Sequence, residues 1–212
     1  MIVYGSSISP YVRKVLAFAA EKAIEVESKA IPLGSHDPAF LAASPFRKMP
    51  AFEDDDFRIS DSTAIIAYLE ALRPDPALIP AEPRARARTI WYEEFADTML
   101  FACFAKMFFN RMVAPRFLGR PGDLAAADAA ERDELPPLLD YLEGVIPDSG
   151  FLLEDRLTLA DVAVASPFVN LDHIGVAIGD RPRLTAYLQP ILARPSFKHW
   201  IDREKAFLAR TA

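Results

Sequence analysis

Cysteine is almost absent from this sequence, since Cys103 is the only one among 212 residues. A single thiol cannot form a disulfide within the chain, and no CxxC pair is present to bind zinc. The three histidines, His36, His173 and His199, do not form the i, i+4 pair that places two imidazoles on one helix face. We therefore predict no metal site, and we assign Cys103, within the apolar stretch LFACFAKMFF, to the core.

The sequence also lacks an excess of basic residues and a long hydrophobic segment. Lys and Arg number 24 against 30 Asp and Glu, so the net charge of −6 offers little attraction to a phosphate backbone. No apolar run reaches the roughly 18 residues of a membrane span, and the N-terminus lacks the basic and apolar regions of a secretory leader. We therefore expect a cytoplasmic protein with neither nucleic acid nor membrane as a partner.

The first 72 residues alternate short strand patterns with helical ones, and 51% of the whole chain is hydrophobic, which is enough for a sizeable core. The predicted elements are a strand at 2–4, a helix at 10–21, a strand at 24–31, a short helix at 37–44, a hairpin at 50–60 and a helix at 61–72. The order βαβαββα predicts a mixed sheet of about four strands with helices on its faces.

The pattern changes after residue 72. Residues 73–86 hold four prolines and little periodicity, which is typical of a linker. The remainder shows only helical runs, at 85–112, 123–142, 159–174, 182–193 and 196–208. We therefore predict an α/β domain at 1–78, a linker at 79–84 and an all-helical domain at 85–212.

One of these helices carries a strong start. In LTLAD, residues 157–161, Thr158 and Asp161 have the spacing of a capping box, in which each side chain satisfies a backbone N–H of the first turn. This motif has a structural role.

Ser9 and Pro10 begin the first predicted helix, and they allow two interpretations. Serine is a favoured N-cap, and proline fits the first helical position because its missing N–H would have no partner there. In the second interpretation, Ser6 or Ser7 serves the helix while the Ser9 hydroxyl points at a ligand.

Two further pairs can contact an anion in the same small domain. Met49-Pro50 stands at the entrance of a predicted strand, where an X-Pro bond can be cis. Asp61-Ser62 stands at the start of a helix, whose free N–H groups and positive dipole end attract a carboxylate. Taken alone, Ser60, Asp61 or Ser62 is better explained as a helix cap. The combination of both pairs with Ser9 in one small domain is more specific and favours a binding site.

In this combination the chain resembles the cytosolic glutathione S-transferases of the serine type over essentially its full length. The motifs that carry the resemblance follow one another in family order: SPYVRKV, SPFRKMPAF followed by SDSTAIIAYLE, ALIPAEPRARARTIWYEEFAD and LTLADVAVA. The resemblance implies a thioredoxin-like N-terminal domain, a helical-bundle C-terminal domain, a homodimer, and glutathione bound mainly by the first domain.

The resemblance also implies a role for Ser9. Its hydroxyl matches the one that donates a hydrogen bond to the glutathione thiolate, and it is not itself a nucleophile. Tyr4 is the alternative donor, because other classes use an N-terminal tyrosine, but it lies within the predicted strand and we assign it to the core. Redox members of the family carry cysteine at position 9, so the serine here argues against disulfide exchange.

The remaining glutathione-binding residues are assigned by the same resemblance. The backbone of Met49, before the cis proline Pro50, matches the partner of the cysteinyl part, and Lys48 lies near the glycyl end. Asp61 and Ser62 match the acid-serine pair that receives the γ-glutamyl group. The family usually has Glu or Gln where this chain has Asp61, so the chain departs from the family pattern at this position. The departure affects how far the carboxylate reaches toward the ammonium.

The electrophile pocket is expected beside Ser9, on a face of the apolar helix at 91–109. Its candidate lining residues are Tyr11, Met99, Phe104, Met107 and Phe108. For each of the four residues of the helix, core packing is the alternative, because the helix is apolar nearly all round.

We interpret the chain as a glutathione transferase that conjugates glutathione, as a thiolate, to a small hydrophobic electrophile, in keeping with detoxification. Glutathione-dependent isomerisation, dehalogenation or ether cleavage would use the same Ser9 chemistry with another pocket. A non-catalytic binding or scaffold protein on the same fold is the alternative from a different class, because fold does not fix function.

Overall fold

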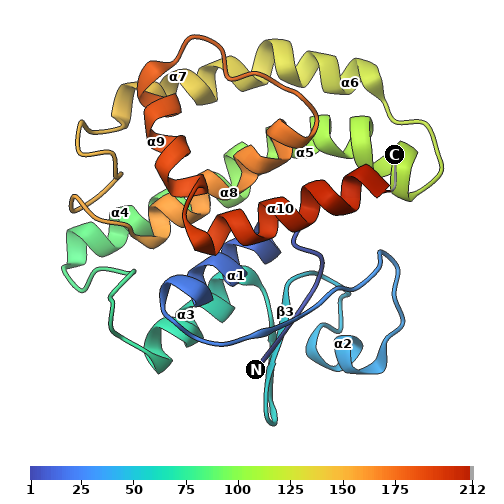
Figure 1. Ribbon diagram of the computed structural model, residues 1–212, viewed down its shortest axis with the longest axis vertical. Coiled ribbons are helices and arrows are strands. Elements are labelled where there is room, and N and C mark those ends of the chain that lie inside the picture. The colour runs from blue at the N-terminus through green and yellow to red at the C-terminus, as the bar shows by residue number, and fades with distance from the viewer. Residues whose placement is uncertain (211–212) are drawn as a thin grey trace.

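The computed structural model describes residues 1–210, and its first 72 residues form the predicted α/β unit (Figure 1). The elements are β1 (Ile2–Tyr4), α1 (Pro10–Glu21), β2 (Glu27–Lys29), α2 (Pro38–Ala43), β3 (Ala51–Asp54), β4 (Phe57–Ser60) and α3 (Ser62–Leu72). The predicted βαβαββα order is therefore confirmed. The second strand is shorter than the alternating pattern at 24–31 suggested.

The sheet has the strand order β2-β1-β3-β4. β1 pairs in parallel with β2 and antiparallel with β3, and β3 and β4 form the predicted hairpin, which turns through Asp55 at a positive φ of 51°. Val3 of β1 faces Phe52 of β3 across the ladder, and both side chains are fully buried. Because side chains alternate along a strand, this register turns one face of the sheet toward α1 and α3.

The rest of the described chain is helical. The elements are α4 (Pro83–Glu94), η1 (Phe95–Leu100), α5 (Phe101–Phe108), η2 (Phe109–Phe117), α6 (Leu124–Ala129), η3 (Ala130–Glu134), α7 (Leu135–Val145), α8 (Leu159–His173), α9 (Pro182–Leu192) and α10 (Pro195–Arg210). The segments η1, η2 and η3 are wider, π-helical stretches. η1 joins α4 to α5 and η3 joins α6 to α7 without a break, and η2 continues α5 to Phe117. The predicted helix at 85–112 therefore runs on to Phe117.

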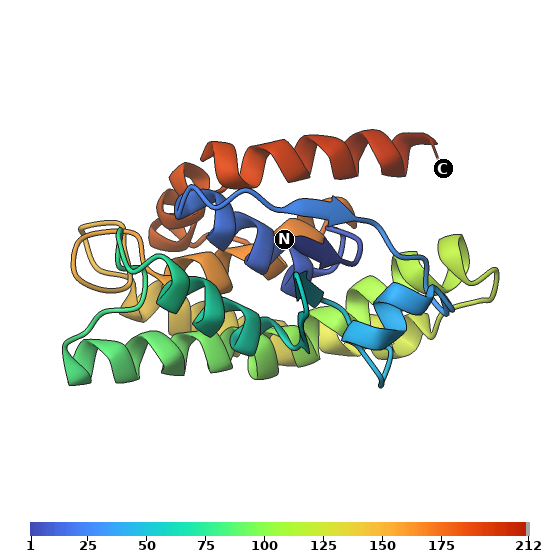
Figure 2. The ribbon, with the colours of Figure 1, turned by 90° about the horizontal axis from the view of Figure 1, so that it is seen from below.

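α1 lies in the middle of the molecule, between α3 on one side and α8 and α10 on the other (Figures 1 and 2). Every residue from Val12 to Ala19 is buried, including Arg13 and Lys14. Both faces of α1 therefore meet other helices. Arg13 and Lys14 can be buried because each has carboxylate partners, described below.

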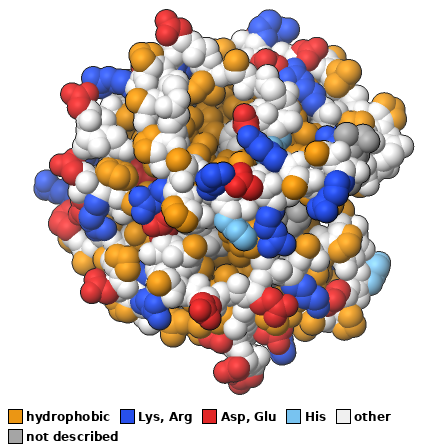
Figure 3. Space-filling view, viewed as in Figure 1, with side chains coloured by type: hydrophobic (Ala, Val, Ile, Leu, Met, Phe, Trp, Pro, Cys, Tyr) orange, Lys and Arg blue, Asp and Glu red, His pale blue; other side chains and the backbone are white. Residues whose placement is uncertain are grey.

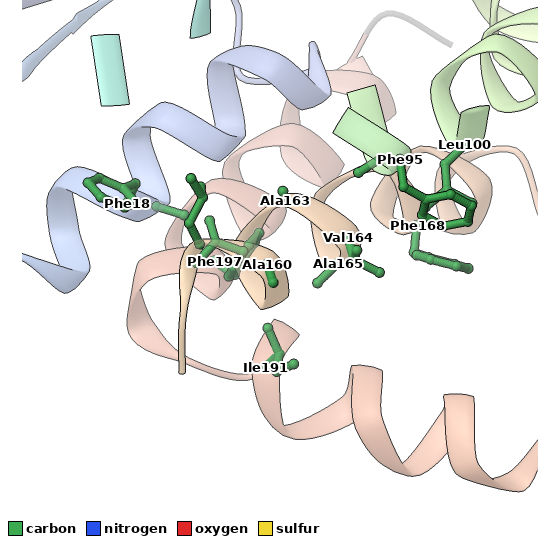
Figure 4. Packing of buried hydrophobic residues seen from close by; sticks show 14 of the residues in the cluster. Phe18, Phe95, Leu100, Ala160, Ala163, Val164, Ala165, Phe168, Ile191 and Phe197 are labelled. Atoms are coloured by element: carbon green, nitrogen blue, oxygen red, sulfur yellow. The ribbon is translucent and has the colours of Figure 1, made fainter. Parts of the chain in front are cut away.

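A single hydrophobic cluster joins the two parts of the chain. Figure 4 shows side chains from α1, η1, α9 and α10 gathered around α8, from Ala160 to Phe168. Leu78 and Ile79 belong to the same cluster, and the Leu78 carbonyl accepts a hydrogen bond from the Leu159 backbone N–H. The predicted linker at 79–84 therefore begins within the core. The predicted second domain ends with residues 211–212, which lie outside the described residues.

The capping box of α8 is confirmed. The Asp161 carboxylate accepts hydrogen bonds from the Thr158 backbone N–H at 2.8 Å and from the Thr158 hydroxyl at 3.0 Å. Burial raises the pKa of Asp161 despite these bonds.

Acidic and basic side chains are intermixed over the face that carries α10 (Figure 3). Across residues 1–210, no helix combines the length and apolar character needed to cross a membrane. Within the same range, no group of three or more His, Cys, Asp or Glu side chains is placed to hold a metal ion.

Candidate active site

Ser9 occupies the N-cap position of α1, but its side chain does not cap the helix. Its φ and ψ of −70° and 125° are extended, and its carbonyl accepts the hydrogen bond from the Arg13 N–H at 3.0 Å. Within the described chain, the Ser9 hydroxyl makes no cap hydrogen bond. The neighbouring Ser6 hydroxyl instead accepts from the Ile8 N–H at 3.4 Å. The half-buried Ser9 hydroxyl is therefore not used by the first turn of α1.

The loop before Ser9 lies against the Met49-Pro50 bond, which is cis as predicted. Gly5 has a φ of +140°, and a Cβ added there would come within 2.6 Å of Val12 and 3.2 Å of the Met49 Cβ. Only glycine fits this position without displacing its neighbours. The carbonyl of Pro50 accepts from the Asp61 backbone N–H at 3.3 Å, so the loop, the cis proline and the start of α3 meet at one edge of the sheet.

Asp61 is the N-cap of α3. Its Oδ1 accepts from the Ala64 N–H at 3.0 Å, and its φ of 102° is strained for a residue other than glycine. Ser62 is buried at the first position of the helix, and its hydroxyl donates to Asp97 across 3.4 Å. The cap interpretation is therefore correct for one oxygen of Asp61, while the N-terminus of α3 still presents its positive dipole end beside Ser62.

Lys48 is exposed on the loop before the cis proline. The Ser44 hydroxyl holds the backbone of Lys48 by accepting from its N–H and donating to its carbonyl, both at 2.8 Å. These two bonds fix the backbone that leads into Met49 and leave the Lys48 side chain in solvent.

A buried ionic network, which the sequence analysis did not identify, lies behind Ser62. Lys14 of α1 places its Nζ 2.9 Å from Glu93 of α4 and 2.5 Å from Asp97 of η1. The Thr63 hydroxyl donates to Glu93 at 2.8 Å. Lys14 and Glu93 are almost completely buried. This network connects the start of α3, through Asp97, to α1 and to the helical part of the chain.

The charges of this network are not balanced. One ammonium faces two carboxylates, and the second oxygen of Glu93 is buried without a hydrogen-bond partner among the described residues. Burial raises the pKa of Asp97, and Lys14 only partly offsets this effect. Two features of the sequence could have indicated the network: Lys14 interrupts an apolar run, and Glu93 and Asp97 are four residues apart, on one face of a helix.

Tyr4 lies where the sequence analysis placed it, in the core. Its side chain is 2% exposed, and its hydroxyl donates to Glu53 Oε2 at 2.6 Å. Burial and the Glu53 carboxylate raise the pKa of Tyr4 to about 12. A phenol held in this way has its proton engaged by Glu53 and is a poor donor to a second anion.

Tyr11 faces the second domain. Its ring packs on Phe101 with centroids 4.5 Å apart, and its hydroxyl donates to the Asp97 carbonyl at 2.7 Å. A cavity of about 10 Å³ lies beside these rings, which is room for at most one water molecule. Tyr11 is half-buried, so it retains surface that a ligand can contact.

The other predicted pocket residues lie in different surroundings. Phe104 and Met107 are buried in the main core, where Phe104 packs edge-to-face against Phe168. Met99 of η1 is 53% exposed. Phe108 belongs instead to a separate small cluster with Met112 and Leu208, against which Ile8, Val113 and Phe117 pack. The side chains of Phe108, Met112 and Leu208 are themselves buried. Since Ile8 directly precedes Ser9, this cluster, which we call the Ile8 cluster, lies next to the Ser9 loop.

Two family models match the chain. The model described as "Glutathione S-transferase, N-terminal domain" matches residues 3–77, and the model described as "Glutathione S-transferase, C-terminal domain" matches residues 91–189. A glutathione S-transferase of Hyoscyamus muticus is 30% identical over 210 residues, which cover 95% of this chain and 98% of that protein.

Solved structures share the fold over the same length. Glutathione transferase F7 from Populus trichocarpa superposes with a TM-score of 0.84 at 27% identity, covering 95% of this chain and 97% of that one. The theta class glutathione S-transferase from Xanthomonas axonopodis pv. citri, solved with glutathione bound, superposes with a TM-score of 0.82 at 24% identity, covering 94% and 96%. At 24% identity the likeness concerns the fold alone.

Proposed function

Because the chain belongs to the glutathione S-transferase family, we propose that it activates glutathione as a thiolate and transfers it to a small, largely apolar electrophile. The family makes it an enzyme with a thioredoxin-like N-terminal part and a helical C-terminal part. Glutathione is the thiol substrate in this family, and the proposal adds the residues that act on it and the class of acceptor.

The observation that carries the proposal is the Ser9 hydroxyl, which stands at the start of α1 without capping it. A free thiol has a pKa of about 8.5, so only a few per cent is ionised at neutral pH. A hydroxyl donor and the positive end of a helix both favour the thiolate. Ser9 donates a hydrogen bond to the glutathione sulfur. Its proton stays on the serine, because no His or Asp side chain among residues 1–210 is hydrogen-bonded to the Ser9 hydroxyl.

Glutathione lies along the edge where the loop at 5–9, the cis proline and α3 meet. The backbone of Met49, before Pro50, pairs with the cysteinyl part, and Lys48 attracts the glycyl carboxylate from its exposed position. The N–H and hydroxyl of Ser62 bind the γ-glutamyl carboxylate at the N-terminus of α3. Asp61, whose second oxygen is not used by the cap, faces the ammonium.

The electrophile binds on the other side of Ser9, against the helical part of the chain. Tyr11 and Phe108 contact it directly, with Phe108 acting as part of the Ile8 cluster. Phe104 and Met107 support this wall from the core, and Met99 contributes from the surface. In this proposal residues 1–78 bind glutathione, and residues 85–212 supply the electrophile pocket together with Tyr11; residues 79–84 join the two parts.

A cytoplasmic homodimer completes the proposal. Trp91 of α4 is 49% exposed and belongs to the long helical stretch that begins at Pro83. Exposed apolar side chains of this size are typical of an interface between protein chains. The partner is a second copy of this chain.

The test is a titration of the pure protein with glutathione, followed by the ultraviolet absorbance of the thiolate at a series of pH values. The proposal predicts a bound thiol with a pKa below the free value of about 8.5. Glutathione binding without thiolate formation would leave the binding or scaffold role as the function. A panel of electrophiles then separates conjugation from isomerisation, dehalogenation and ether cleavage by their products.

A further inference from the structure

Arg13 is the largest fully buried side chain of the described residues, and all three of its nitrogens are used. Its Nε and Nη2 donate to the two oxygens of Glu204 at 3.0 and 2.7 Å. Its Nη1 donates to the Ser166 carbonyl at 2.7 Å and to Asn170 Oδ1 at 3.1 Å. The Nη2 also lies 3.5 Å from the carbonyl oxygen of Ile8, the residue before Ser9.

Side chains of α8 hold two carbonyls near Ser9, those of the preceding residue Ile8 and the following residue Pro10. The Ile8 carbonyl accepts from Asn170 Nδ2 at 2.9 Å, and the Pro10 carbonyl accepts from the Ser166 hydroxyl at 2.8 Å. The Ser9 N–H donates to the Ser6 carbonyl at 3.0 Å. These bonds fix the backbone of Ser9 at both ends, so the direction of its Cα–Cβ bond depends on them.

The same cluster is joined to α10. Glu204 accepts from Arg13 and lies 2.8 Å from His173 Nε2, and both carboxylate partners are buried. One turn further along α10, Leu208 belongs to the Ile8 cluster. α10 therefore supplies both the carboxylate that neutralises Arg13 and a side chain of the Ile8 cluster beside Ser9.

We propose that Arg13, Asn170 and Ser166 are positioning residues: they hold the carbonyls of Ile8 and Pro10 and thereby aim the Ser9 hydroxyl at the glutathione sulfur. A hydrogen bond to a thiolate weakens when its donor turns away, so a loop that is free to rotate would leave the thiol less ionised while glutathione still binds elsewhere. This inference rests on the proposed function.

A purely structural role makes a different prediction, and the chain offers a matched control. Glu21, at the other end of α1, pairs with Arg194 at 2.7 Å and accepts from Ser196 at 2.5 Å. This contact also joins α1 to the start of α10, but it lies three helical turns from Ser9. Glu21→Gln therefore weakens the same junction between the two parts of the chain without touching the Ser9 loop.

The experiment measures the pKa of bound glutathione, the glutathione affinity and the melting temperature for Asn170→Ala, Ser166→Ala, Arg13→Lys and Glu21→Gln. Asn170→Ala removes the donor to Ile8 without adding charge, and it should raise the bound thiol pKa by about one unit, which lowers the thiolate population about tenfold well below the pKa. Ser166→Ala should also raise the bound thiol pKa. Arg13→Lys keeps the charge, so its bound thiol pKa should lie between those of wild type and Asn170→Ala. Glutathione affinity should change less than about threefold.

Glu21→Gln should lower the melting temperature and leave the thiol pKa at the wild-type value. If Asn170→Ala and Ser166→Ala fold, bind glutathione and keep the wild-type thiol pKa, the positioning role is wrong although the proposed function stands. If wild type itself forms no thiolate, the proposed function fails and this inference fails with it. Should Arg13→Lys not fold, the two alanine variants, which leave the buried charge pair intact, still decide the question.

Discussion

The Nζ atom of Lys14 lies 2.5 Å from the Asp97 carboxylate, and Asp97 in turn accepts a hydrogen bond from the Ser62 hydroxyl. The first residue of α3 is thus tied to an ion pair that crosses from the α/β part of the chain to the helical part. The charges of Lys14, Glu93 and Asp97 therefore contribute both to the surroundings of Ser62 and to the packing of the α/β part against the helical part.

Replacing Lys14 by Met should destabilise the protein strongly. The substitution leaves the Glu93 and Asp97 carboxylates buried without their cation, and removing one partner of a buried pair typically costs about 3 to 5 kcal/mol. Urea unfolding at pH 7 measures the change in the free energy of unfolding. Lys198→Met is the control, because it breaks an exposed pair with Asp202 and should cost less than about 0.5 kcal/mol.

The same variant should be less impaired in acid. Burial raises the pKa of Asp97 above its ordinary 3.8, so folding favours its protonated form and this carboxyl destabilises the fold less as the pH falls. The difference between wild type and Lys14→Met should therefore shrink between pH 7 and pH 4. A difference that grows on acidification would contradict the assigned charges.

Glu204→Gln should show a related pH dependence. Burial alone would raise the pKa of Glu204, but the Arg13 charge and the bonds from His173 and Arg13 together hold it below the ordinary 4.5. A lowered folded-state pKa adds stability above pH 4.5 that is lost as the pH falls through the folded value. We expect Glu204→Gln to reduce the free energy of unfolding by about 3 kcal/mol at pH 7 and by much less at pH 3. Equal losses at both pH values would disagree with an ionised Glu204.

Tyr4→Phe should have little effect on conjugation. The Tyr4 hydroxyl is committed to Glu53, so its loss costs about 1 kcal/mol of stability, as for a typical hydrogen bond, and leaves the Ser9 loop unchanged. Initial rates of conjugation at pH 7 check the activity, and a thermal melt checks the loss of stability. A Tyr4→Phe enzyme that folds but has lost its activity would move the donor role from Ser9 to Tyr4.

Phe108 and Met107 should separate the pocket from the core. Met107 is fully buried in the main core, so Met107→Ala should cost about 2 to 5 kcal/mol of stability and leave the ranking of electrophiles unchanged. Phe108→Ala, in the Ile8 cluster, should change that ranking while glutathione affinity stays close to wild type. Rates on a panel of electrophiles, together with melting temperatures, give both readouts. A ranking altered by Met107→Ala alone would show that the substrate reaches deeper than the Ile8 cluster.

Local patterns in the sequence predicted most of the fold. The β3–β4 hairpin follows from its aspartate turn, and the start of α8 follows from Thr158 and Asp161, because in each case the interacting groups are only a few residues apart. The position of proline at the start of a strand allowed a cis bond at Met49-Pro50, and the family resemblance predicted it. The order of the elements then followed from their periodicity.

The environment of α1 could not be predicted in this way. The carboxylates that make the burial of Arg13 and Lys14 possible are 191 and 79 residues away in the sequence, so the helix gives no local indication that it has no exposed face. For the same reason, sequence spacing did not assign Phe108 to the Ile8 cluster and Phe104 and Met107 to the main core. Helical periodicity identifies apolar residues, but it does not say which neighbour covers them.

The pKa of glutathione bound to Ser9→Ala, compared with wild type, shows whether the Ser9 hydroxyl stabilises the thiolate. Removing one donor to an anion in a shielded site typically costs about 2.7 to 4 kcal/mol, or 10²- to 10³-fold in kcat. We predict that Ser9→Ala folds and binds glutathione, that the pKa of the bound thiol rises toward the free value of about 8.5, and that conjugation falls by this factor. A Ser9→Ala enzyme with the wild-type thiol pKa and full conjugation activity would contradict the account.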